Sequence, residues 1–170
     1  ESAVKPIEPV FLDYQKDMSQ LKAKSDIPVL YKQNVANDLF QLIYVFDMGN
    51  NHDKALGTAF DYLEYLGTSD MTPEELKSEF YRLACTFYVS PGNERTYVVL
   101  SGLNENMPAA VQLFEKLLAD AQVNKEAYTN MTGDILKARS DAKLNQGQNF
   151  SRLMSFAMYG PKSPATNLLT

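Results

Sequence analysis

The chain has 170 residues, of which 45% are hydrophobic and 22% are charged, and its formal net charge is −5. A chain of this length can form one domain that buries about 70% of its unfolded surface. The acidic balance and the lack of a basic stripe argue against nucleic acid as a partner. No apolar run approaches the roughly 20 residues that span a bilayer, so no membrane span is expected.

Cys85 is the single cysteine, so no internal disulfide can form. Its neighbours Leu83, Ala84 and Phe87 are apolar. This setting favours a buried, small hydrophobic side chain over a nucleophile.

Residues 1–26 show no clear core pattern. Pro6 and Pro9 interrupt the start, and residues 11–24 predict a short polar helix. We therefore expect a linker or an arm that lies over another domain. The first residues do not have the pattern of a signal peptide, and they look like a cut inside a longer chain.

Two strands and a helix are predicted next. Residues 28–33 indicate a short strand, and the aromatic and β-branched run 39–46 indicates a longer one. Because this run is apolar on both faces, we expect it at the centre of a sheet that helices cover on at least one side. Asp53 is the expected N-cap of the following helix, and Gly67 its left-handed C-terminal residue. The apolar face of this helix consists of Leu56, Phe60, Leu63 and Leu66.

The second helix has a capping box, with Thr72 as N-cap, Pro73 in the first turn and Glu75 three residues after the cap. Its expected core face is Leu76, Phe80 and Leu83. Two strands, 86–90 and 95–100, follow and flank the turn-forming residues 91–93. This arrangement predicts an antiparallel hairpin.

Three helical segments complete the chain, and Asn124 is the expected N-cap of the second. The third ends before Gly160. Their apolar stripes are Val111, Phe114, Leu117 and Leu118, then Ala127, Met131, Ile135, Ala138 and Ala142, then Phe150, Leu153, Met154 and Ala157. The element order predicts an α+β fold in which helices pack on one face of an antiparallel sheet.

The stretch Thr58-Ala-Phe-Asp-Tyr-Leu-Glu-Tyr-Leu-Gly-Thr68 resembles a helix of the insulinase/pitrilysin family of zinc metallopeptidases. Active members carry H-x-x-E-H there, with two imidazoles that bind zinc and a glutamate that activates water. Matching the family's Gly-Thr to Gly67-Thr68 places Thr58 and Tyr62 at the histidine positions and Asp61 at the glutamate position. The resemblance therefore implies a degenerate motif without metal ligands or catalytic residues.

Further strings, such as Pro73-Glu-Glu-Leu76 and Phe87-Tyr-Val89, extend the resemblance over roughly residues 28–160. Family members commonly have two related halves that close around a peptide, and only the first half binds zinc. The chain resembles the first domain of the second half, with residues 1–26 as linker, 27–160 as a non-catalytic domain and 161–170 as the start of the next connection. The resemblance implies that the family's last domain, which carries its known substrate contacts, lies beyond residue 170.

The resemblance also implies what this domain works with. It implies no cofactor in this chain, zinc in the catalytic half of the same polypeptide, and an unstructured peptide as substrate. Bacterial proteases of this kind often act in the cell envelope or periplasm.

Two other functions stay open at this point. The chain can belong to a zinc-less scaffold or interaction subunit that lacks a catalytic half. Alternatively, His52, Asp61 and Glu64 can form an unusual metal or acid pair of an autonomous hydrolase. Against this second alternative, a lone histidine in a loop and carboxylates on a helix are more often solvated surface residues. The same holds for the carboxylates and basic residues of the later helix, which are Glu126, Asp134, Asp141, Lys137, Arg139 and Lys143.

Overall fold

The computed structural model describes residues 9, 11 and 13–166, with Pro164 described by its backbone alone. The chain divides into two compact units, between Asp38 and Leu39. In the first unit, strands β1 (Ser19–Lys22) and β2 (Pro28–Tyr31) pair antiparallel around the short 3-10 turn η1 (Lys24–Asp26). The strand expected within 28–33 is thus confirmed. The polar helix expected over 11–24 is wrong over the described residues, where β1 follows a turn.

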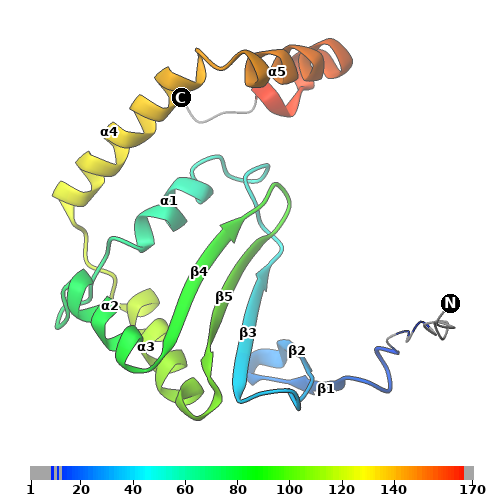
Figure 1. Cartoon of the computed structure of the whole chain (residues 1–170), viewed down its shortest axis with the longest axis vertical. Coiled ribbons are helices and arrows are strands. Elements are labelled where there is room, and N and C mark those ends of the chain that lie inside the picture. The colour runs from blue at the N-terminus through cyan, green and yellow to red at the C-terminus, as the bar shows by residue number, and fades with distance from the viewer. Residues whose placement is uncertain (1–8, 10, 12, 167–170) are drawn as a thin grey trace, which may run out of the picture. The chain divides into compact units, whose positions relative to one another are not determined.

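The second unit contains a three-stranded antiparallel sheet in the order β3-β5-β4 (Figure 1). Its strands are β3 (Leu39–Phe46), β4 (Cys85–Pro91) and β5 (Thr96–Leu103). The hairpin of β4 and β5 and the strand 39–46 are confirmed, and so is the α+β fold.

The central position of the strand 39–46 was predicted wrongly, because β3 lies at one edge of its sheet. The central strand is β5, in which Val98, Val99 and Leu100 are all buried. In β3, Ile43 and Val45 are about half exposed. The strand buried on both faces is therefore the one with the continuous Val-Val-Leu run.

Helices α2 (Pro73–Arg82) and α3 (Met107–Ala119) pack their apolar residues on one face of the sheet. Phe87 of β4 lies between them, with ring centroids 5.2 Å from Phe80 and 5.0 Å from Phe114. The core contains Leu76, Phe80, Leu83, Ala110, Leu113, Phe114 and Leu117. Leu118, which we expected in the α3 stripe, is 48% exposed, and Ala110 and Leu113 complete the buried face instead.

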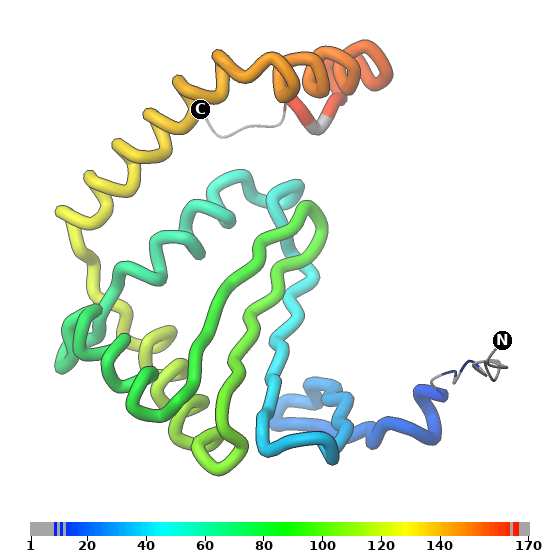
Figure 2. Tube along the Cα trace, viewed as in Figure 1, coloured from blue at the N-terminus to red at the C-terminus, as the bar shows by residue number. Residues whose placement is uncertain are grey.

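The other helices are α1 (Leu56–Leu63), α4 (Lys125–Ala142) and α5 (Gln146–Tyr159). Short 3-10 turns precede α3 (η2, Asn104–Asn106) and follow α5 (η3, Gly160–Lys162; η4, Pro164–Thr166). Helix α4 leads away from the sheet to α5 (Figure 2). Met131 is the buried residue of α4, and none of α5 is buried. The last two helices therefore contribute little to the core of this unit.

Local signals placed the starts of α2 and α4 well. The Thr72 hydroxyl accepts from the Glu75 amide at 3.2 Å, and the Glu75 carboxylate accepts from the Thr72 amide at 2.8 Å. Asn124 caps α4 by accepting from the Ala127 amide at 3.0 Å.

The N-cap expected at Asp53 is wrong, because α1 begins at Leu56 and its N-cap is Ala55, which forms no side-chain cap bond. The Asp53 carboxylate accepts from the Ala55 amide at 2.8 Å, in the turn before the helix.

The conformation expected of Gly67 is wrong, because Gly67 does not have a positive φ. It forms an isolated antiparallel bridge with Gln122 instead. A Cβ atom at this position would collide with the carbonyl oxygen of Met71. Glycine is required here by a close approach of two backbone segments, and not by a left-handed helix cap.

Candidate functional site

Helix α1 lies alongside β4 (Figure 1). It carries Thr58, Asp61 and Tyr62, the residues that the resemblance places at the positions of the zinc motif. Leu63 of α1 belongs to the hydrophobic core, and Phe60 packs against this core. Thr58 and Tyr62 are partly buried, whereas Asp61 is exposed. The three side chains thus occupy one helix, at the spacing that the sequence gives them.

The hydroxyl of Tyr62 both donates to and accepts from the backbone of Asn124. It donates to the carbonyl oxygen of Asn124 at 2.6 Å and accepts from the Asn124 amide at 2.9 Å. The Tyr62 ring also contacts Tyr128 edge to face, at 5.6 Å between centroids. Tyr62 thereby joins α1 to the start of α4.

These residues do not fit a zinc ion. The Thr58 side chain has a hydroxyl group and no nitrogen atom that could bind a metal. The Tyr62 hydroxyl is hydrogen-bonded to the backbone of Asn124. Structural and catalytic zinc sites use thiolate, imidazole or carboxylate ligands in sets of three or four. Among the described residues, no three side chains of the His, Cys, Asp and Glu types are grouped so that they could hold a metal ion.

The residues of the alternative hydrolase do not form such a group either. His52 is exposed, and its Nδ1 atom accepts from the Gly49 amide at 3.1 Å. Asp61 and Glu64 are exposed on α1. The acidic and basic residues of α4 considered above are all exposed as well: Glu126, Asp134, Lys137, Arg139, Asp141 and Lys143.

Cys85 is buried, as its apolar neighbours predicted. Its thiol donates to the Leu83 carbonyl oxygen at 3.3 Å. Burial raises the pKa of the Cys85 thiol above its ordinary value. A thiol of this kind is a poor nucleophile at neutral pH.

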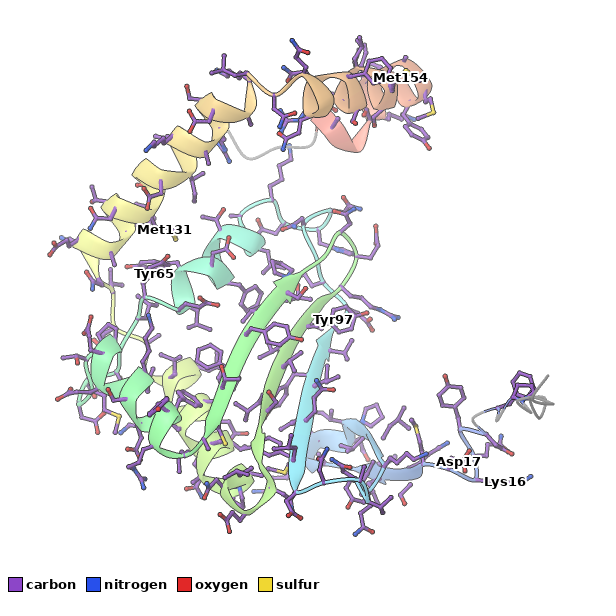
Figure 3. All side chains as sticks on the ribbon, viewed as in Figure 1. Lys16, Asp17, Tyr65, Tyr97, Met131 and Met154 are labelled. Carbon is purple, nitrogen blue, oxygen red and sulfur yellow. The ribbon has the colours of Figure 1, made fainter. Side chains whose placement is uncertain are left out.

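A cavity of about 330 Å³ lies between the end of α1, helix α2 and the first half of β4. Apolar side chains dominate its walls: Leu63, Leu66, Leu76, Phe80 and Phe87. Two charged residues, Glu64 and Lys77, also line it. Tyr65 follows α1 (Figure 3). The Lys77 ammonium lies 5.8 Å from the centre of the Tyr65 ring. We call this cavity, together with the neighbouring edge of β4, the α1–β4 groove.

The α1–β4 groove was not predicted from the sequence. Its walls consist of core residues that the helical periodicity did identify, such as Leu76 and Phe80. Nothing in the sequence marks β4 as an edge strand, because strand order is set by long-range pairing.

A polar network holds the loop between α1 and α2 against α3. Asp70 pairs with Lys116, and the Ser69 amide donates to Asp120 at 2.8 Å. These bonds lie beside a second, polar cleft between residues 67–75 and 122–125. The network fixes the end of α1 and thereby one wall of the α1–β4 groove.

No protein-family model and no curated protein sequence matches the chain. Its fold is similar to solved peptidase structures. The periplasmic protease PqqL from Escherichia coli matches with a TM-score of 0.75 and 14% identity, over 99% of this chain and 20% of PqqL. The inactive peptidase M16 domain from Pseudomonas fluorescens matches with a TM-score of 0.75 and 18% identity, over 88% of this chain and 37% of that one.

A third similar structure is a mutant of the ferredoxin protease FusC, in complex with Arabidopsis ferredoxin. It matches with a TM-score of 0.71 and 12% identity, over 100% of this chain and 20% of FusC. The chain thus spans between a fifth and about two fifths of these structures. The likeness defines the class of fold, which is that of domains in M16-type peptidases, an inactive domain included.

No helix among the described residues combines the length and the apolar character needed to cross a membrane.

Proposed function

We propose that the chain is a non-catalytic domain of a zinc metallopeptidase of the insulinase/pitrilysin type. In this proposal, residues 27–160 form part of a chamber that encloses an unstructured peptide. Residues 1–26 are the linker from the catalytic half, and residues 161–170 lead to the next domain. The zinc ion belongs to the other half of the same polypeptide.

The observation that carries the proposal is the position of Tyr62. The fold resembles an inactive peptidase M16 domain over 88% of this chain. In the proposed match, Tyr62 of α1 corresponds to the second motif histidine, and its hydroxyl is bonded to Asn124. A structural hydrogen bond thus takes the place that a zinc ligand has in an active half. This pairing of a peptidase-like fold with a structural tyrosine supports a role in chamber formation and not in catalysis.

A domain of this kind contributes to proteolysis through shape. It closes the chamber, keeps folded proteins out and lines a wall that an extended peptide contacts. The reaction in the full-length protein is hydrolysis of a peptide bond by zinc-activated water, which takes place away from this chain.

The test uses the full-length protein that contains this chain. We expect about one zinc ion per molecule, cleavage of an unstructured peptide, and resistance of a tightly folded protein of the same composition. A chelator should abolish the cleavage. If the full-length protein binds no zinc and cleaves nothing, the proposal is wrong and the scaffold function replaces it.

A further inference from the structure

The outer edge of β4 has free backbone groups at alternate residues. The Gly92 amide donates to the Arg95 carbonyl at 2.8 Å, and the Leu103 amide to the Ala84 carbonyl at 3.4 Å. Paired residues of an antiparallel ladder alternate between hydrogen-bonded and non-hydrogen-bonded. The pairs Gly92–Arg95 and Ala84–Leu103 are hydrogen-bonded, so every second pair between them is hydrogen-bonded as well. By this alternation, Phe87 and Val89 form non-hydrogen-bonded pairs with Leu100 and Val98. Their N–H and C=O groups therefore point away from β5, toward the open edge.

Within the described part of the chain, no other element covers this edge with hydrogen bonds. The sheet ends at β4, and no loop or helix bonds to the backbone of Phe87 or Val89. Unpaired edge groups of this kind are a template for one further strand. The chemical complement of such an edge is an extended peptide.

The cavity beside this edge has the size and the apolar lining to accept one side chain of an added strand. Its volume of about 330 Å³ is at the lower limit of small-molecule sites, which span roughly 300–1,000 Å³. Its walls are mostly leucine and phenylalanine side chains, and Phe87 belongs both to the cavity and to the free edge. An apolar side chain on a strand added next to Phe87 would therefore reach the cavity.

The α1 wall of the groove adds negative charge. Glu64 lines the cavity, and Asp61 lies one turn before it on the same helix. Neither carboxylate has an ion-pair or hydrogen-bond partner among the described residues. Lys77 lies against the Tyr65 ring. Because side chains on the same face of a strand recur every second residue, a basic residue two positions from the apolar one would meet these carboxylates.

We propose that the α1–β4 groove binds an extended peptide segment as an additional strand on β4. An apolar side chain of the peptide fills the cavity, and a basic side chain two residues away pairs with Asp61 and Glu64. The proposal rests on the proposed function, because it names the wall of the chamber that contacts peptide and the kind of sequence it prefers. The carboxylate pair then serves recognition, and not acid–base chemistry.

The test is binding of fluorescent eight-residue peptides to the 170-residue chain, measured by anisotropy. The reference peptide is mostly threonine and serine, with one leucine and one arginine two residues apart. We expect saturable binding that weakens about tenfold when leucine is replaced by glycine. Methylation of one peptide amide nitrogen at a time should weaken binding about tenfold at every second position. At the positions between them, it should leave the affinity unchanged.

Two protein variants match the peptide changes. Asp61→Asn with Glu64→Gln should weaken binding of the arginine peptide about threefold and leave a norleucine analogue unchanged. The control, Asp134→Asn with Asp141→Asn on α4, makes the same charge change elsewhere and should have no effect. Val89→Pro removes an edge N–H and should weaken binding of every peptide, with circular dichroism verifying the fold.

Three results would overturn the proposal: no saturable binding, equal effects of N-methylation at all positions, or a dimer in sedimentation that Val89→Pro dissociates. The last result would assign the edge to a second copy of the chain. If the full-length protein hydrolyses peptides but the 170-residue chain binds none, only the proposed peptide binding in the groove is refuted. If the 170-residue chain binds peptides but the full-length protein has neither zinc nor activity, only the proposed function is refuted.

Discussion

The hydroxyl of Tyr62 on α1 forms two hydrogen bonds with the backbone of Asn124, one through the carbonyl oxygen and one through the amide. Asn124 in turn caps α4 with its side chain. Helix α1 therefore serves as the attachment point of α4.

Tyr62→Phe removes both hydrogen bonds and leaves the partly buried amide and carbonyl of Asn124 without this partner. We expect a loss of about 1–2 kcal/mol in the free energy of unfolding. Amides at the start of α4 should also exchange faster with solvent. Urea denaturation and hydrogen exchange measure the two effects.

The control for this change is Tyr65→Phe. Tyr65 is 46% exposed, and its hydroxyl has no hydrogen bond among the described residues. This variant should be close to wild type. Equal stability of the two variants would show that the Tyr62 hydroxyl does not hold α4.

Gly67→Ala should destabilise the fold because its Cβ atom would collide with the Met71 carbonyl oxygen. We expect a loss of about 2–3 kcal/mol, as for overpacked core positions. Gly133→Ala on α4 is the matched comparison, since a Cβ there meets nothing within 4 Å. That change should raise helix content and stabilise α4 by about 0.5–1 kcal/mol. A thermal midpoint for Gly67→Ala at or above the wild-type value would contradict the close approach.

Local patterns in the sequence predicted the caps of α2 and α4 and the hairpin correctly. The capping box of Thr72 and Glu75 and the cap by Asn124 depend only on residues three positions apart. The turn between β4 and β5 depends on a few adjacent residues. Such features follow from local hydrogen bonding and are therefore accessible without knowledge of the fold.

Features that depend on long-range pairing were not accessible. The sequence made the strand 39–46 look central, yet β5 takes that place, since β3 and β4 both pair with it. Gly67 forms its bridge with Gln122, which lies against it only in the folded chain. The α1–β4 groove likewise requires β4 at the edge of the sheet. Apolar strands can be recognised from the residue pattern, whereas their order in the sheet cannot.

Acid should weaken the loop between α1 and α2. The ion pair with Lys116 and the Thr68 hydroxyl lower the pKa of Asp70, and hydrogen bonds from the Ser69 hydroxyl and amide lower that of Asp120. A folded-state pKa below the unfolded value means that the carboxylate stabilises the fold at higher pH. This contribution is lost as the pH falls through the folded-state pKa, below the ordinary aspartate value of 3.8.

We therefore expect stability to decline below about pH 4, with a flatter decline in Asp120→Asn, which has no proton to take up. The comparison is Asp134→Asn, which changes an exposed aspartate of α4 without such bonds. Urea midpoints between pH 2.5 and pH 6 give the profiles. An unchanged acid slope in Asp120→Asn would exclude a contribution from its bonds to Ser69.

Cys85 should react slowly with iodoacetamide in the native chain. Burial restricts access to the thiol and raises its pKa. Labelling, followed by mass spectrometry, should accelerate strongly in urea, where the single cysteine becomes exposed. Fast labelling of the native chain would mean that β4 opens readily beside the cavity.

The most direct test of the central claim compares the 170-residue chain with the full-length protein in one experiment. Zinc content and cleavage of an unstructured peptide are measured for both samples. We expect zinc and activity in the full-length protein, and neither in the chain, because the proposed match to the zinc motif places Thr58 and Tyr62 at the ligand positions. Stoichiometric zinc together with peptide cleavage by the chain alone would contradict the account.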